Sequence, residues 1–392
     1  MTMKTQKPDT TIYVMTHKAC LVPPDPHYTL LQVGCAAIGD DGKKRPDLGY
    51  LRDDTGENIS AKNIYYSELT GLYWVWKNDH RSDIVGTCHY RRFLLDEKGY
   101  VLSADEIEKA LAGGCDLITT KLLKLNFSYY DGFSKNHRPG YLDRLSEVLA
   151  AEDPKMSAVY EQAVRGNRTY FGNMLIAPKT LYDEYCAWLF GILGKLEEAV
   201  VIEEEDSYHR RIFGFISEFL LYVYVLGRGL SVKECKVGLL GEKTEIPEIR
   251  RCLAQFFEKR DTAGAREYFL AQRKMRPDLL MEASDVTGEL HLCMEVIAIA
   301  GAEEETVKNA GSGGRGSGIC PIYRAAPTYE KLMEFCRKLN HYTIERLKGT
   351  PDPDERAFME QNGVSAEARA VSEAMFSGLT EGDQSYGSRN CT

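Results

Sequence analysis

The chain has 392 residues, of which 43% are hydrophobic, 27% charged and 10% aromatic, and its formal net charge is −9. This length predicts one large domain with an accessory module, or two domains, and the apolar and aromatic content excludes a chain disordered throughout. The acidic balance argues against a general nucleic-acid binder, because that function needs an excess of Lys and Arg on one face.

The sequence also argues against a membrane span and against a disulfide framework. The longest apolar run, residues 213–225, is too short to cross a bilayer and contains Glu218. The first ten residues are polar and show no secretory signal. Eleven cysteines are scattered without paired spacing. We therefore expect reduced thiols in a cytoplasmic protein.

Strand and helix patterns alternate through the first 245 residues. The expected strands are residues 11–15, 83–88, 116–120 and 173–177. The expected helices are residues 60–78, 103–112, 180–198 and 207–226. This alternation predicts an α/β sandwich with a mostly parallel central sheet over residues 1–245.

The remainder, residues 246–392, is helical and charged in pattern. Its expected helices are residues 247–259, 262–274, 290–300, 328–347, 354–362 and 365–376. The segment 311–318 (GSGGRGSG) has the composition of a flexible linker. A small α-helical C-terminal module is the simplest interpretation.

Ligands of open α/β sheets bind beyond the carboxyl ends of the strands. One polar segment directly follows the first expected strand and would lie at such an end. It consists of Thr16, His17 and Lys18. A hydroxyl, an imidazole and an ammonium suit a phosphate or a ribose. An ordinary solvated loop would explain the same residues.

A second segment, His89-Tyr90-Arg91-Arg92, follows the strand 83–88. Two adjacent arginines beside a histidine offer many donors for a diphosphate, and Arg is preferred where phosphate is bound in a planar, bidentate way. The alternative is a pair of surface arginines that form salt bridges with acidic side chains.

The third segment, residues 51–60 (LRDDTGENIS), lies just before a helix. Asp53 and Asp54 could hold a ribose, a sugar hydroxyl or a metal ion, and Asn58 is a further candidate for binding a nucleotide-sugar. A tight turn and a helix cap account for the same residue types, and the two interpretations are compatible.

Two carboxylates are candidates for a general base. Glu218 lies inside an apolar helix, where a desolvated carboxyl has a raised pKa unless it is paired, for instance with Arg210 or Arg211. Asp206 ends an acidic run before that helix, which is also favourable charge at a helix N-terminus.

The sequence lacks G-x-G-x-x-G after its first strand and G-x-x-x-x-G-K-[ST] anywhere, which argues against a dinucleotide-binding domain and a P-loop enzyme. It contains the ordered blocks IYVMTHK, LRDDTGENISAKNIYYSELTGLYWVWKN, IVGTCHYRRF, GNMLIAPK and RIFGFISE. With these blocks, residues 10–245 resemble the "domain of unknown function 4422" family. The resemblance implies a GT-A-type glycosyltransferase fold and a place in bacterial capsular or exopolysaccharide biosynthesis.

The resemblance further implies transfer of a hexose, with galactofuranose among the candidates, from a nucleotide-sugar such as a UDP-sugar to a growing, lipid-linked acceptor. The site would then lie at the cytoplasmic face of the membrane. Many GT-A enzymes carry a metal-binding Asp-x-Asp after a central strand. Here His89-Tyr90-Arg91-Arg92 stands in that place. Metal-independent transfer is therefore expected, with Asp53 and Asp54 as the alternative ligands for Mg²⁺ or Mn²⁺.

Under this hypothesis the site residues divide by role. His89, Arg91 and Arg92 stabilise the diphosphate leaving group, and Glu218 or Asp206 takes the proton of the acceptor hydroxyl. The nucleotide-sugar is bound by Thr16, His17, Lys18, Asp53, Asp54, Asn58 and Tyr90. The alternative is a non-catalytic adaptor that binds glycan or nucleotide, with the segment 311–318 as a hinge to a partner-recruiting tail.

Overall fold

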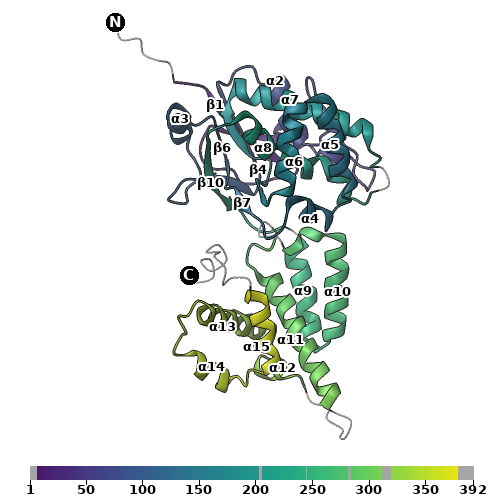
Figure 1. Cartoon of the computed structure of the whole chain (residues 1–392), viewed down its shortest axis with the longest axis vertical. Helices are drawn as coiled ribbons and strands as arrows, with labels where there is room; N and C mark the ends of the chain where they lie inside the picture. The colour runs from purple at the N-terminus through teal and green to yellow at the C-terminus, as the bar shows by residue number, and fades with distance from the viewer. Residues whose placement is uncertain (1–6, 203–204, 244, 281–283, 311–318, 378–392) are drawn as a thin grey trace. The chain divides into compact units, whose positions relative to one another are not determined.

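The computed structural model describes residues 7–202, 205–243, 245–280, 284–310 and 319–377 (Figure 1). The chain forms two compact units, Met1–Leu240 and Gly241–Thr392. The expected linker at 311–318 lies outside the described residues.

The first unit is built on an eight-stranded sheet in the order β3-β2-β1-β4-β5-β10-β6-β9, in which β4 also pairs with β9. The strands are β1 (Thr10–Thr16), β2 (Tyr28–Gln32), β3 (Leu51–Arg52), β4 (Ile84–His89), β5 (Arg92–Leu95), β6 (Leu117–Thr120), β9 (Leu175–Pro178) and β10 (Val232–Leu239). A separate pair joins β7 (Leu123–Lys124) and β8 (Arg168–Thr169).

The sheet is mixed, and six of its eight strands run in one direction. β3, β2, β1 and β4 are parallel, whereas β5 and β9 run antiparallel to every strand they pair with. The reversal at β5 has a local cause. His89 pairs with Arg92 across the two residues Tyr90 and Arg91. A connection this short joins only antiparallel strands.

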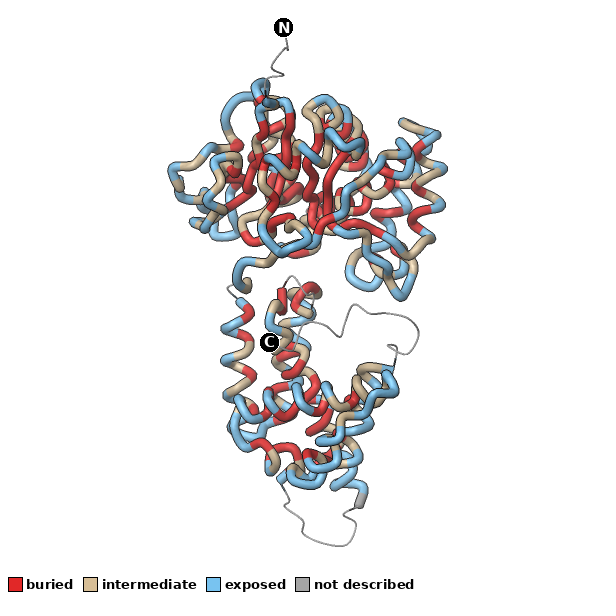
Figure 2. The backbone as a smooth tube through the Cα atoms, turned by 90° about the vertical axis from the view of Figure 1, so that its left-hand side faces the viewer, coloured by how far each residue is buried: buried red, intermediate tan, exposed pale blue. Residues whose placement is uncertain are grey.

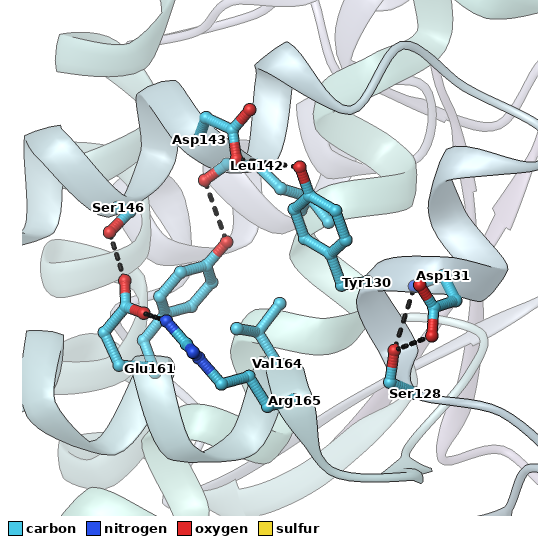
Figure 3. Close-up of a pocket in the computed structure, with 10 residues that line it drawn as sticks. Ser128, Tyr130, Asp131, Leu142, Asp143, Ser146, Glu161, Val164 and Arg165 are labelled. Atoms are coloured by element: carbon cyan, nitrogen blue, oxygen red, sulfur yellow. Dashed lines mark hydrogen bonds and ion pairs between the residues drawn. The ribbon is translucent and has the colours of Figure 1, made fainter.

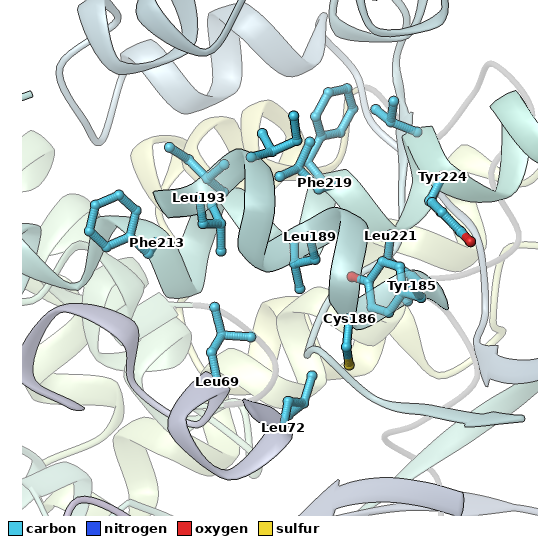
Figure 4. Close-up of a cluster of buried hydrophobic side chains, with 14 of the residues drawn as sticks. Leu69, Leu72, Tyr185, Cys186, Leu189, Leu193, Phe213, Phe219, Leu221 and Tyr224 are labelled. Atoms are coloured by element: carbon cyan, nitrogen blue, oxygen red, sulfur yellow. The ribbon is translucent and has the colours of Figure 1, made fainter. Parts of the chain in front are cut away.

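Helices cover both faces of the sheet. They are α1 (Asn63–Tyr66), α2 (Leu69–Asn78), α3 (Ala104–Ala112), α4 (Tyr129–Ser134), α5 (Gly140–Glu152), α6 (Pro154–Arg165), α7 (Lys179–Ala199) and α8 (Ile212–Arg228). Alternate residues of β1 point to opposite faces, so that Tyr13 and Met15 join the core under α7 and α8, while Ile12 and Val14 join a smaller core with α3. Part of the larger core is shown in Figure 4, and buried stretches of the backbone are coloured red in Figure 2.

One expected helix is broken. The pattern over 60–78 predicts a single helix, but the chain forms a 3₁₀ turn at Ser60–Lys62, then α1, and then α2 after a break. Ser67 occupies the break with φ of 53°, a left-handed conformation that a helix interior does not allow. The break places Glu68 at the start of α2.

The second unit is helical, with α9 (Glu245–Glu258), α10 (Thr262–Met275), α11 (Glu289–Ala310), α12 (Pro321–Ala325), α13 (Tyr329–Leu347), α14 (Glu355–Gln361) and α15 (Ala366–Phe376). The helices expected from the sequence are present, and α12 is additional. Side chains such as Leu253, Val296 and Leu339 form its core. Across the described residues of both units, no helix combines the length and hydropathy needed to cross a membrane.

Close packing over β4 gives a testable prediction. Gly86 lies opposite Ile12 in β1 and Ile176 in β9, and a Cβ added to it would lie 2.5 Å from Ile12 Cδ1 and 2.7 Å from Ile176 Cγ1. We expect Gly86→Ala to lower the free energy of unfolding by about 1–3 kcal/mol in urea denaturation, because the isoleucines must shift.

The matched control is Gly191→Ala in α7, where a Cβ meets nothing within 4 Å. That change should raise stability by about 0.5–1 kcal/mol, because alanine favours a helix interior more than glycine does. Equal stability of the two variants would contradict the close packing described for Gly86.

Candidate active site

Five charged or titratable side chains from distant parts of the first unit meet at the carboxyl-end edge of the sheet. They are Glu68 at the start of α2, His89 at the end of β4, Arg92 at the start of β5, Arg211 just before α8, and Glu218 within α8. Glu68 Oε1 lies 3.9 Å from His89 Nε2. We call these five residues the charged cluster.

The helix break at Ser67 positions the first member. Arg211 Nε donates a hydrogen bond of 3.0 Å to Ser67 Oγ, and the Asn63 side-chain amide donates to the Ser67 carbonyl. These contacts hold Ser67 from both sides, so Glu68 is fixed relative to Arg211.

Asn173, just before β9, links three elements at the edge of the cluster. Its Nδ2 donates to Glu68 Oε1 at 2.8 Å and to the Gly214 carbonyl at 3.0 Å, and its Oδ1 accepts from Ser217 Oγ at 2.8 Å. Its backbone has φ of 48°, which Asn tolerates better than most residues. Asn173 therefore joins the loop before β9 to α2 and α8.

His89 is neutral at pH 7. Burial lowers its pKa to about 4 against the opposing effect of Glu68. Its Nε2 is buried and has no hydrogen-bond partner in the described part of the chain. Burial alone would raise the pKa of Glu68, but His89, the Asn173 amide and Arg211 together hold that pKa below its usual value, so Glu68 is ionised.

Glu218 behaves differently from Glu68. Burial and the negative charge of Glu68 raise the pKa of Glu218 to about 7, in opposition to Arg92 and Arg211. The side chain is only half-buried, so a ligand can reach it. A carboxyl that gains and loses its proton near neutral pH is suited to general acid–base chemistry.

Three arginines supply positive charge at this edge. Arg92 and Arg211 belong to the charged cluster. Arg45, from the loop between β2 and β3, lies close enough to Arg211 to feel its charge and donates Nη1 to the Val33 carbonyl at 2.7 Å. None of the three forms an ion pair with a carboxylate of the described residues, whereas Arg52 pairs with Asp54, and Arg210 with Asp40. Half-buried arginines that form no direct ion pair are suited to an anionic ligand.

The residues expected at the ends of β1 and β4 gather around one ring. The His17 ring meets the Tyr90 ring edge-on at 5.1 Å between centroids, Lys18 Nζ lies 5.2 Å from its centroid, and Arg91 Cζ lies at 5.8 Å. Thr16 is buried, and its hydroxyl bonds to the backbone of Lys18, so its role is to shape the turn. We call His17, Lys18, Tyr90 and Arg91 the Tyr90 cluster.

The loop after β3 is held by its own hydrogen bonds. Asp53 is fully buried and accepts from Gly34 N, Cys35 N, Ser60 Oγ and Thr70 Oγ1, at 2.7, 3.1, 2.5 and 2.7 Å. Asp54 forms a bidentate pair with Arg52, and Asn58 bonds to Gly56 and Ser60. These contacts match the turn interpretation.

A divalent cation does not fit Asp53 and Asp54, because the oxygens of both carboxylates already have partners. Elsewhere in the described ranges, no three His, Cys, Asp or Glu side chains are arranged to hold a metal ion.

The two candidate bases lie in different settings. Asp206 is exposed and accepts from Tyr208 N, His209 N and His209 Nδ1, so it caps the turn before α8 and is not part of the charged cluster. Of the residues expected to be catalytic, the fold brings together His89, Arg92 and Glu218. Sequence reasoning gave no role to Glu68, Asn173 or Arg45, and considered Arg211 only as a partner of Glu218.

Comparison with known proteins shows which family the chain belongs to. Residues 11–229 match the model of the family described as "Domain of unknown function (DUF4422)". The chain belongs to this family. The resemblance inferred from the sequence blocks is thereby confirmed, and the matched residues include the charged cluster and the Tyr90 cluster. No curated protein matches the sequence.

Among solved structures, the DUF4422 chain is similar to the apo structure of WbbM, a bifunctional glycosyltransferase, with 27% sequence identity and a TM-score of 0.54. The similarity covers 60% of this chain and 46% of the WbbM chain, so this chain spans less than half of that protein. The similarity therefore relates the fold of this chain to part of a glycosyltransferase.

A separate pocket of about 560 Å³ lies between α4, α5 and α6 of the DUF4422 domain (Figure 3). Its polar groups bond to one another, as in the contacts of Tyr130 with Asp143 and of Ser128 with Asp131. It contains no residue of the charged cluster. We place the candidate active site at the charged cluster, because two perturbed titratable groups, His89 and Glu218, lie there beside two arginines at the carboxyl ends of strands.

The conformation of Asn173 gives a prediction for the DUF4422 domain. Asn173→Ala removes the bonds to Glu68, Gly214 and Ser217 and leaves a Cβ at a left-handed φ, so we expect a loss of about 2–4 kcal/mol in unfolding free energy. Asn173→Gly removes the same bonds without that strain and should be more stable than the alanine variant by about 1 kcal/mol. Urea denaturation of the two variants measures the difference, and identical stabilities would argue against strain at this position.

Proposed function

We propose that this chain is a glycosyltransferase that moves a hexose from a nucleotide-sugar to a hydroxyl of a glycan acceptor. The observation that carries the proposal is the presence of Glu218 beside Arg92 and Arg211 at one edge of the sheet. The reaction needs both kinds of group, because a base must take the acceptor proton and positive charge must stabilise the diphosphate leaving group. The similarity to WbbM agrees with this chemistry.

In the proposed reaction, the acceptor oxygen attacks C1 of the donor sugar, and its proton passes to Glu218. The bond between C1 and the diphosphate oxygen breaks, and the electron pair leaves with the diphosphate. Arg92, Arg211 and Arg45 stabilise the charge that develops there. A single displacement of this kind inverts the configuration at C1.

The nucleoside end of the donor, for which we propose uridine, would be bound by the Tyr90 cluster. The cluster lies at the ends of β1 and β4, and it combines an aromatic ring with the cations Lys18 and Arg91. Ligands of α/β sheets bind at such strand ends. In the proposed GT-A-type site, the Tyr90 cluster thus binds the nucleoside, and the charged cluster carries out the transfer.

No step of this proposal passes through a metal ion, because Asp53 and Asp54 do not fit one. The family resemblance supports a lipid-linked acceptor in capsular or exopolysaccharide assembly at the cytoplasmic face of the membrane, with galactofuranose among the candidate hexoses.

The proposed base gives a prediction about activity and pH. Because Glu218 must be ionised to act and its pKa is about 7, kcat/KM should rise with pH through about 7 and then level off. Glu218→Gln should lower kcat by about 10²- to 10⁴-fold and leave donor binding intact. The assay offers a panel of nucleotide-sugars and a lipid-linked acceptor to the full chain, and NMR of the product reports the configuration at C1.

Two outcomes would oppose the proposal. If the full chain neither binds nor consumes any donor of the panel, transferase chemistry is excluded for those donors. If it binds a donor or glycan, and polysaccharide production survives Glu218→Gln but not deletion of the helical unit, the adaptor interpretation is favoured.

The proposed leaving-group site gives a second prediction. Arg92→Lys and Arg211→Lys keep the charge and lose the planar, bidentate donors, so each should weaken UDP binding about tenfold in calorimetry, the effect of losing about 1.4 kcal/mol. Arg210→Lys is the matched control, since Arg210 pairs with the exposed Asp40 next to the same helix. A loss of UDP affinity as large in the control would contradict a specific role for Arg92 and Arg211.

A further inference from the structure

We propose that Glu68 is the positioning residue for Glu218, a role that rests on the proposed transfer function. Glu68 holds the segment of α8 that carries Glu218, and it places a fixed negative charge beside that carboxyl. Neither the family match nor the similarity to WbbM assigns a role to this residue.

The first support is a chain of hydrogen bonds from Glu68 to the residue before Glu218. Glu68 accepts from Asn173, and Asn173 accepts from Ser217, the residue before Glu218. Asn173 Nδ2 and Ser217 Oγ both also bond to the Gly214 carbonyl, one turn earlier in α8. Asn173 is 3% exposed and Ser217 is fully buried, so water has little access to the part of the path between these two residues.

The second support is the balance of charge around Glu218. The charged and titratable groups that face it are Glu68 from the start of α2, Arg92 from β5, Arg211 from the turn before α8, and Tyr129 from α4. Burial raises the pKa of Tyr129 far above its usual value, so Tyr129 stays neutral. The two arginines favour the ionised form of Glu218, and the negative charge of Glu68 opposes them.

This balance matters for the reaction. The arginines that would bind the diphosphate also lower the basicity of any carboxylate beside them, which weakens it as a proton acceptor. The charge of Glu68 offsets that effect and lets Glu218 take up a proton near neutral pH. Glu68 thus allows a base and a diphosphate site to share one edge of the sheet.

A Glu68–His89 pair in which His89 is the base fits less well. The two side chains are 3.9 Å apart, and the pKa of His89 is about 4, so His89 accepts a proton at pH 7 far less readily than Glu218 does. We therefore assign the effect of Glu68 to Glu218.

The test is Glu68→Gln, which keeps an oxygen to accept from Asn173 and removes the charge. Carboxyl titration of the full chain, labelled with ¹³C-glutamate and followed by NMR, should contain one signal with a midpoint near pH 7 that disappears in Glu218→Gln. In Glu68→Gln this midpoint should fall by about one pH unit, the effect of removing a neighbouring charge. The acid limb of the kcat/KM profile should move by the same amount.

Two further variants complete the test. Glu57→Gln removes an exposed carboxylate that pairs with Lys77 outside the cluster, and it should leave the midpoint of Glu218 unchanged. Glu68→Asp keeps the charge on a shorter side chain and should keep the midpoint near 7 while lowering kcat. It also serves as the variant to compare if Glu68→Gln does not fold.

The outcomes separate the two proposals. Two results would overturn the role of Glu68. One is a midpoint of Glu218 that does not change in folded Glu68→Gln. The other is a midpoint in Glu68→Asp that falls by about one pH unit, as is expected for Glu68→Gln. A midpoint that shifts as expected in a chain that turns over no nucleotide-sugar would uphold the positioning role and reject the transferase function.

Discussion

The hydrogen bond from Asn173 to Glu68 is the contact on which the arrangement of the charged cluster depends. It joins the loop before β9 to the start of α2, and the same amide group reaches α8 through Gly214 and Ser217. Asn173 keeps a left-handed backbone to make these bonds, and Ser67 keeps one to deliver Glu68. The surrounding hydrogen bonds thus hold a strained, positive φ at both residues, and this backbone conformation fixes the positions of Glu68 and α8 relative to each other.

The charged cluster also shows how an acidic chain can keep arginines outside direct ion pairs. The net charge of −9 is that of the whole sequence, and some arginines near the sheet edge pair with carboxylates, as Arg52 and Arg210 do. Within the described residues, Arg45, Arg92 and Arg211 form no such ion pair. For an anionic ligand, the charge near the site matters more than the net charge of the chain. That local charge depends on which arginines form no direct ion pair with a carboxylate.

The sequence was sufficient for elements with a local signal. The helix expected at residues 103–112 is present as α3, which begins with a capping box of Ser103 and Glu106, and β1, β4, β6 and the tail helices follow from hydrophobic periodicity. The helix break had no such signal, because Ser67 is held by Asn63 and Arg211. For the candidate site, a lone carboxylate within an apolar helix was the sequence pattern that indicated Glu218 as a candidate base. Glu68 and Asn173 resemble an ordinary helix start and an ordinary turn. Asp53 was interpreted as a possible ligand-binding residue because its hydrogen-bond donors Gly34, Cys35 and Thr70 are distant in the sequence and could not be foreseen.

The bond between Arg211 and the hydroxyl of Ser67 has a thermodynamic consequence. The guanidinium proposed to meet the diphosphate is the one that holds the bend before α2. Occupancy of the donor site and formation of the bend are then linked equilibria, and linkage is reciprocal. If a bound donor stabilises the bent backbone by some factor, the bent backbone strengthens donor binding by that same factor. A single serine hydroxyl in the middle of a helical pattern would in this way contribute to the affinity for a ligand that it does not touch.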